Sequence, residues 1–159
     1  MVIPKFVRSI GYTILVIVAL LVLAVNFNLT AGAQPTNLGI NNGQLLACPA
    51  TPNCVSSQAP TSDVAHTIAP LPLAGDRDQT MAKLQRSIEA LPRTKIIRAN
   101  DNYLYVEASS QLMRFVDDLE FYLDDKSQKI QVRSAARLGE SDLGVNRQRI
   151  EEIRAKLAA

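Results

Sequence analysis

The chain of 159 residues has one histidine, two cysteines and no acidic residue before Asp63. Its few potential metal ligands follow the order C-x5-C and then D-x2-H, which departs from the spacing of zinc sites, so no metal is expected. Net charge is also lacking beyond the N-terminus. Lys5 and Arg8 are two of the 17 cations, and the other 15 balance the 15 carboxylates. A neutral chain of this kind is not expected to bind nucleic acid.

The N-terminal part contains the apolar run TILVIVALLVLAV, from Thr13 to Val25. Two basic residues precede the run and Ala31-Gly32-Ala33 follows it, which is the order of a secretory signal. The apolar part is shorter than the about 20 residues of a membrane span, yet residues 10–27 could form one marginal transmembrane helix. We expect residues 1–33 to be a signal peptide, with an uncleaved membrane anchor as the alternative. Either segment directs export of the remainder, because the basic residues stay in the cytoplasm.

The exported part divides by composition. Residues 34–47 are polar and rich in Gly and Asn, so we interpret them as a linker. Residues 48–75 carry most of the prolines without an apolar period, which predicts an irregular loop or a segment that wraps the domain. We expect residues 48–159 to form a single domain with its own core.

The regular part predicts one helix, four strands and a second helix. Apolar residues recur at helical spacing over 76–92 and 141–159, and Ser141 or Asp142 is expected to cap the second helix. Between them, strands are expected over the ranges 94–99, 103–109, 114–125 and 129–137. The short connections favour a four-stranded antiparallel meander with both helices on one face, an α+β fold.

The opposite face of the predicted sheet is polar and carries Tyr105, Glu107, Glu120, Tyr122 and Arg133. Such a face must be solvated, covered by residues 48–75 or used for binding. Cross-strand pairs of opposite charge are the preferred interpretation. An anion site formed by arginines near the start of the last helix is the alternative.

Both cysteines lie in the stretch CPATPNC, residues 48–54. In an oxidising compartment, a pair in one exported domain usually forms a disulfide, here Cys48–Cys54, and the two prolines would bend the short ring. The alternatives are a metal-bound thiol, or a nucleophilic Cys54 with His66 as its base and Asp63 orienting the histidine. Nothing in the pattern around Cys54 would activate its thiol, which favours the disulfide. His66 is then a packed or capping residue, and Asp63 holds a turn.

Four segments occur in a specific order: CPATPNCVSSQA, DVAHTIAPL, YLYVEASSQLMRFVDDLEFYLDD and IQVRSAARLGESDLGVNRQRIEEIR. Together they resemble the family of domains of unknown function numbered 1499, over about Leu46 to Leu157. The resemblance implies a bacterial, cyanobacterial or plastid-associated protein, and it brings no agreed activity. It also implies signature positions, namely Cys48, Pro49, Pro52, Asn53, Cys54, Ser56, Ser57, Asp63, His66, Glu107, Arg114, Asp117, Asp118, Glu120, Arg133, Ser134, Arg137, Asp142, Asn146 and Arg147.

These observations predict that the loop, the polar face and the start of the last helix form one binding surface. Its candidate residues are Asp63, His66, Tyr105, Glu107, Asp118, Glu120, Arg133, Arg137, Asn146 and Arg147. The predicted function is that of an accessory or binding module on the periplasmic or thylakoid-lumen side, tethered to the membrane if residues 1–33 are retained, which binds a membrane protein complex. A hydrolase or thiol enzyme is the alternative, using Cys54 and His66 or the carboxylates of Glu107 and Asp118. No cofactor is expected.

Overall fold

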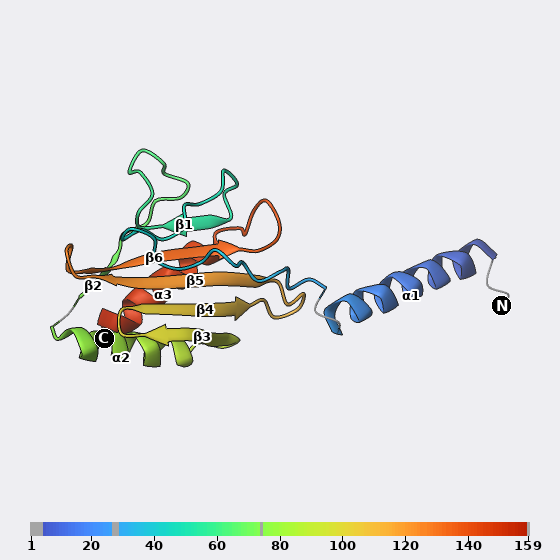
Figure 1. The fold of residues 1–159 in the computed structure, drawn as a ribbon. Helices are drawn as coiled ribbons and strands as arrows, with labels where there is room; N and C mark the ends of the chain where they lie inside the picture. Colours follow the sequence, from blue (N-terminus) through green and yellow to red (C-terminus); the bar gives the residue numbers. More distant parts are fainter. Residues whose placement is uncertain (1–4, 27–28, 74, 159) are drawn as a thin grey trace.

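The computed structural model describes residues 5–26, 29–73 and 75–158. Helix α1 (Lys5–Asn26) projects away from an α+β domain, as Figure 1 shows. The domain contains β1 (Cys54–Ser56), β2 (Leu71–Pro72), α2 (Arg77–Glu89), β3 (Thr94–Asn100), β4 (Tyr103–Ser109), β5 (Val116–Asp124), β6 (Lys129–Ala136) and α3 (Val145–Ala158).

All six of these strands form one antiparallel sheet in the order β1-β6-β5-β4-β3, with β2 also paired to β6. The predicted α+β class and the meander from β3 to β6 are confirmed. Within the part of the chain that the structure describes, the strands number six and not four, because residues 48–75 contribute β1 and β2. These strands have three and two residues, too short for an alternating pattern, and they form because β6 offers a free edge for hydrogen bonds.

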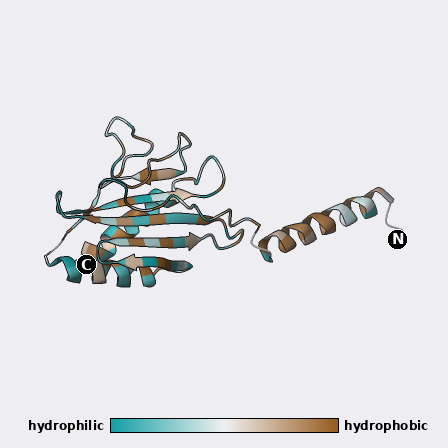
Figure 2. Cartoon of the chain, in the orientation of Figure 1, coloured by the Kyte–Doolittle hydropathy of each residue, from teal (hydrophilic) through white to brown (hydrophobic). Residues whose placement is uncertain are grey.

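Helices α2 and α3 cover one face of the sheet, and the hydrophobic core lies between these helices and the sheet. Leu84 and Ile88 of α2 and Ile150 and Ile153 of α3 are fully buried in the same cluster as the sheet residue Phe121. Figure 2 shows the corresponding alternation of hydrophilic and hydrophobic bands along the strands.

An acidic residue shortly before each helix of the domain accepts hydrogen bonds from the backbone near the helix start. The Asp76 carboxylate accepts from the backbone N–H of Gln79 at 3.0 Å. The predicted Asp142 accepts from the N–H of Asn146 at 2.8 Å. Helix α3 nevertheless starts at Val145, later than expected, because Leu143 and Gly144 have φ values of 56° and 82° that a right-handed helix does not allow.

The second face of the sheet is covered by residues 29–47, which we call the strap, and not by residues 48–75. Leu38 and Leu45 pack against Tyr103 and Tyr105, and the backbone N–H of Gly39 donates to Glu120 at 2.8 Å. In Figure 1 the strap is the blue to cyan segment that crosses the strands. The segment interpreted as a linker therefore contacts the domain, while residues 48–75 extend the sheet beyond β6.

Helix α1 is long and apolar enough to cross a membrane, and its large side chains are exposed: Leu15 is 68% and Leu20 60% accessible. A signal sequence near the N-terminus has the same properties. The choice between a cleaved leader and an anchor therefore stays a prediction. Residues 1–4, 27 and 28 of the predicted leader lie outside the described residues.

Candidate functional site

The predicted binding residues form two groups on different sides of the sheet, and not one surface. Side chains alternate along β6, so Arg133 points towards the strap while Ser134 points towards α3, where it donates a hydrogen bond to Asn146. We call the strap-side group the buried charge cluster; its members are Tyr103, Tyr105, Glu107, Asp118, Glu120, Arg133 and Arg137. We call the second group the loop clasp; its members are Asn53, Asp63, His66, Asn146 and Arg147.

Glu120 is the anchor of the strap. Its side chain is fully buried, and Oε1 accepts from the Tyr103 hydroxyl at 2.7 Å and from the Gly39 N–H at 2.8 Å. Burial and the neighbouring carboxylate raise the pKa of Tyr103, so the hydroxyl keeps its proton and donates it. The charge of Glu120 therefore holds strand β4 and the strap together.

Arg133 lies opposite Glu120 and is its counter-charge. The Nη1 atom is 3.5 Å from Glu120 Oε2, at the outer limit of a hydrogen bond, and the residue is 5% exposed. Among the described residues, no group accepts a hydrogen bond from its buried Nε. Burial lowers the pKa of Arg133, and the attraction of Glu120 opposes this effect. Arg133 thus depends on Glu120 for its charge balance.

Arg137 holds the other end of the buried charge cluster. Its Nε donates to Asp118 at 2.9 Å, and its Nη2 donates to the Tyr105 hydroxyl at 3.0 Å and to Glu107. Burial alone would lower the pKa of Arg137, but hydrogen bonds to Asp118 and Glu107 outweigh it and raise the pKa. Glu107 and Asp118, the candidate hydrolase carboxylates, are thus both committed to one arginine.

In the loop clasp, both ring nitrogens of His66 face acceptors. Nδ1 is 2.7 Å from Asp63 Oδ2, and Nε2 is 3.1 Å from the backbone oxygen of Thr51. A carboxylate and a carbonyl only accept, so both contacts are satisfied when the imidazole carries two protons. The Asp63 hydrogen bond, followed by the Thr51 one, raises the pKa of His66, and His66 lowers the pKa of Asp63.

The remaining members of the loop clasp bind backbone carbonyls. Arg147 donates to the oxygens of Thr67 at 2.8 Å and Ala65 at 3.0 Å. The amide of Asn146 donates to the Asn53 oxygen at 3.3 Å. These contacts hold residues 48–75 against α3. They give Asn146 and Arg147 partners within the chain, so a structural role accounts for both side chains.

Cys48 and Cys54 form the predicted disulfide, with their Sγ atoms 2.07 Å apart. Cys54 is 1% exposed, and the ring nitrogens of His66 are engaged by Asp63 and Thr51. The structure therefore contradicts the alternative of a thiolate on Cys54 activated by His66. Over the described ranges, no group of three or more His, Cys, Asp and Glu residues is placed to hold a metal ion.

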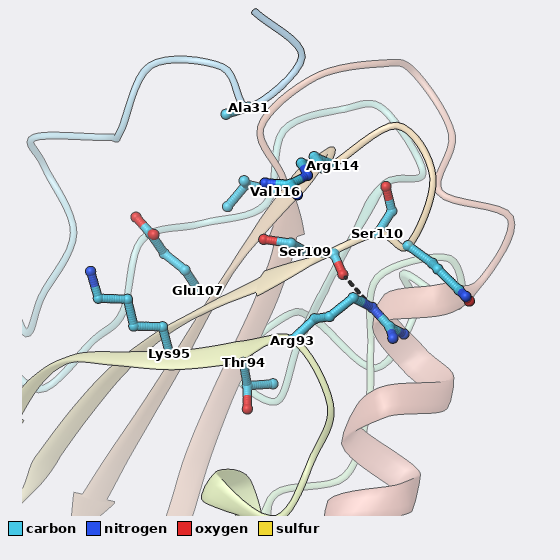
Figure 3. Close-up of a pocket in the computed structure, with 10 residues that line it drawn as sticks. Ala31, Arg93, Thr94, Lys95, Glu107, Ser109, Ser110, Arg114 and Val116 are labelled. Carbon is cyan, nitrogen blue, oxygen red and sulfur yellow. Dashed lines mark hydrogen bonds between the residues drawn. The ribbon is translucent and has the colours of Figure 1, made fainter. Parts of the chain in front are cut away.

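A cavity of about 420 Å³ adjoins the exposed side of the buried charge cluster (Figure 3). Its lining combines the strap, β3, β4 and the loop before β5: Ala31, Arg93, Thr94, Lys95, Glu107, Ser109, Ser110, Gln111, Arg114 and Val116. Arg93 and Arg114 have φ values of 58° and 54°, which are uncommon for residues other than glycine.

Three cations thus face one carboxylate in the cavity, and Glu107 is already paired with Arg137. This charge balance suits an anion. Of the three cations, the sequence pointed only to Arg114, through the resemblance. Arg93 and Lys95 belong to no motif or apolar period, so only their placement in space relates them.

Comparison with known proteins finds one family. A family model described as "Protein of unknown function (DUF1499)" matches residues 44–157, which span the end of the strap, both groups of polar residues and the cavity cations. The comparisons with curated proteins and with solved structures each give no match.

Proposed function

The chain belongs to the family of proteins of unknown function DUF1499, and we propose that it is an exported binding module that α1 tethers to a membrane. In this proposal the domain lies on the periplasmic or thylakoid-lumen side and binds a membrane protein complex. Residues 1–33 then act as an uncleaved anchor.

The observation that carries this proposal is the exposure of α1 together with its short connection to the domain. The 22-residue helix buries none of its apolar window against the protein, and a bilayer would remove that surface from water. Thr30, four residues after the end of α1, already donates a hydrogen bond to the Met113 oxygen in the domain. Four residues reach at most about 14 Å, so the domain would sit directly at the membrane surface.

The orientation follows from charge and redox chemistry. Lys5 and Arg8 precede the apolar part of α1, which favours a cytoplasmic N-terminus and a domain on the opposite side. The Cys48–Cys54 disulfide supports an oxidising compartment on that side.

The bonding of the candidate carboxylates favours binding over hydrolysis. Asp118 is 2% exposed, whereas the Glu107 side chain is 22% exposed and lines the cavity. A general acid or base must come within hydrogen-bond distance of a substrate proton, and both of these carboxylates already accept hydrogen bonds from Arg137. Large exposed side chains such as Leu143, 92% accessible, remain available to a partner.

Native mass after gentle extraction tests the proposal. The full chain carries a C-terminal tag, is expressed in its own host and is extracted with a mild detergent for native electrophoresis. We expect the tag in the membrane fraction, at the chain's full length and at the mass of a larger complex. The control replaces residues 1–28 with an efficiently cleaved signal and so keeps the strap; a larger share of its domain than of the full chain should appear in the soluble fraction. A wild-type chain already shortened and soluble would overturn the tether, and membrane-bound protein at monomer mass would overturn the partner complex.

A further inference from the structure

The cavity beside Glu107 lies at the end of the domain that is joined to α1. Ala31 lines it, five residues after the helix ends, and Thr30 binds the loop between β4 and β5 that carries Arg114. Five residues span at most about 17 Å. In Figure 1 the same loop lies beside the start of the strap, at the end of the domain that faces α1. If α1 crosses a membrane, as proposed above, this cavity opens at the level of the lipid headgroups.

We propose that Arg93, Lys95 and Arg114 bind the phosphate of an anionic lipid headgroup and thereby seat the domain on the membrane. All three side chains are exposed and line one cavity, although they come from the turn after α2, from β3 and from the loop before β5. A guanidinium group offers paired donors that match phosphate oxygens, and the lysine adds a compact charge. The volume of the cavity, about 420 Å³, is within the range of roughly 300–1,000 Å³ of small-molecule sites.

The local charge is favourable because the carboxylate in the cavity is already neutralised. Glu107 is the one acidic residue among the ten that line it, and its Oε1 is bonded to Arg137. Figure 3 shows the hydrogen bond that the Nε of Arg93 donates to the backbone oxygen of Ser109, at 3.2 Å, with the guanidinium group on the side away from Lys95 and Glu107. Its Nη atoms carry the remaining donors of the guanidinium group.

Apolar side chains at the same end complete a membrane-facing surface. Leu29, Leu112 and Phe115 are 72%, 82% and 42% exposed, and Thr30 connects the first of them to the loop of the other two. Exposed apolar residues beside cations are typical of surfaces that enter the headgroup region. The apolar groups would insert while the three cations contact the phosphates.

Leu112→Trp tests the proposal because the sequence contains no tryptophan. The full-length variant is reconstituted into brominated phosphatidylcholine vesicles, with or without about one third phosphatidylglycerol, at about 0.1 M salt. We expect its emission to shift to shorter wavelength and to be quenched strongly only in the anionic vesicles. The control is Lys126→Trp, beyond the other end of β5; the nine residues of that strand span about 30 Å, so its emission should not be quenched.

A charge variant in the Leu112→Trp background tests the three cations. Each cation near an anionic leaflet strengthens membrane attraction about fivefold. Arg93→Gln, Lys95→Gln and Arg114→Gln together should therefore lower the ratio of membrane-bound to unbound domain on the order of 100-fold. The matched control neutralises three exposed cations outside the cavity, Arg86→Gln, Arg98→Gln and Lys129→Gln. It should retain the quenching.

The outcomes separate the headgroup site from the tether. A chain that sediments with both kinds of vesicle but is quenched equally in both would overturn the headgroup site and leave the tether standing. A chain that sediments only with anionic vesicles would overturn the tether and support the headgroup site, and one that sediments with neither would overturn both. Quenching that survives in the variant with Arg93→Gln, Lys95→Gln and Arg114→Gln would overturn the cavity as the site of the lipid phosphate.

Discussion

Glu120→Gln tests whether buried charge holds the strap on the sheet. Glutamine keeps an oxygen for the Tyr103 hydroxyl and the Gly39 N–H, but it presents an NH₂ group to Arg133 in place of Oε2. Arg133 is 5% exposed and then lacks its opposite charge. Breaking a buried ion pair in this way costs about 3–5 kcal/mol, because the remaining charge stays desolvated. That is a large part of the about 5–15 kcal/mol that stabilises a typical domain.

The assay is thermal unfolding of the full chain in non-ionic detergent, followed by circular dichroism. For a domain of this size, 1 kcal/mol corresponds to about 3–5 °C, so we expect Tm to fall by roughly 10–20 °C. Hydrogen exchange at the Gly39 amide should accelerate, because the strap is held less tightly.

Two further variants make this prediction specific. Glu152→Gln is the matched control, because this side chain is 54% exposed and forms a long ion pair, 3.8 Å from Lys156 Nζ. Its loss should cost less than about 1 kcal/mol of stability. Adding Arg133→Met to Glu120→Gln should recover most of the loss, because an apolar side chain needs no counter-ion. If Glu120→Gln unfolds at the same temperature as Glu152→Gln, the strap is not held by the charge of Glu120.

Three further predictions concern the loop clasp and the disulfide. Reduction of Cys48–Cys54 should lower the free energy of unfolding by about 2–2.5 kcal/mol, the loop-closure value for so small a ring; an unchanged urea midpoint would contradict it. The raised pKa of His66 means that its contribution is complete below its ordinary value of 6.5 and is lost as pH rises through the raised value. The lowered pKa of Asp63 means that its contribution is present above 3.8 and is lost as pH falls through the lowered value, so the pair should stabilise most between these limits. An NMR titration of His66 should give a lower pKa in Asp63→Asn, and equal values would exclude the ion pair. Arg147→Gln should speed proteolysis of residues 57–70 relative to Arg86→Gln, because it releases the carbonyls of Thr67 and Ala65.

The features that local patterns encode were predictable from the sequence. The periods of β3 to β6 and of the two domain helices gave the α+β class, and the alternation along β5 and β6 placed Glu120 and Arg133 on the same face. The close spacing of Cys48 and Cys54 gave the disulfide. In each case the information lies in neighbouring residues.

The strap and the cavity were not predictable, because the residues that form their contacts lie far apart in the sequence and follow no local pattern. Leu38 and Leu45 stand among polar residues without a period, and only contact with Tyr103 and Tyr105 distinguishes them from a linker. The three cavity cations come from segments that meet only after the meander has formed.

The two kinds of polar residue in this domain should therefore give different mutant phenotypes. Glu120 and Arg133 are inaccessible and hold the strap, so a variant that loses binding through them first loses folding stability. Arg93, Lys95 and Arg114 are exposed, and neutralising them should change membrane attraction while leaving Tm almost unaltered. A binding defect with a normal Tm identifies the cavity, whereas a defect with a lowered Tm identifies the strap. Measuring binding alone would confuse a structural support with a contact surface.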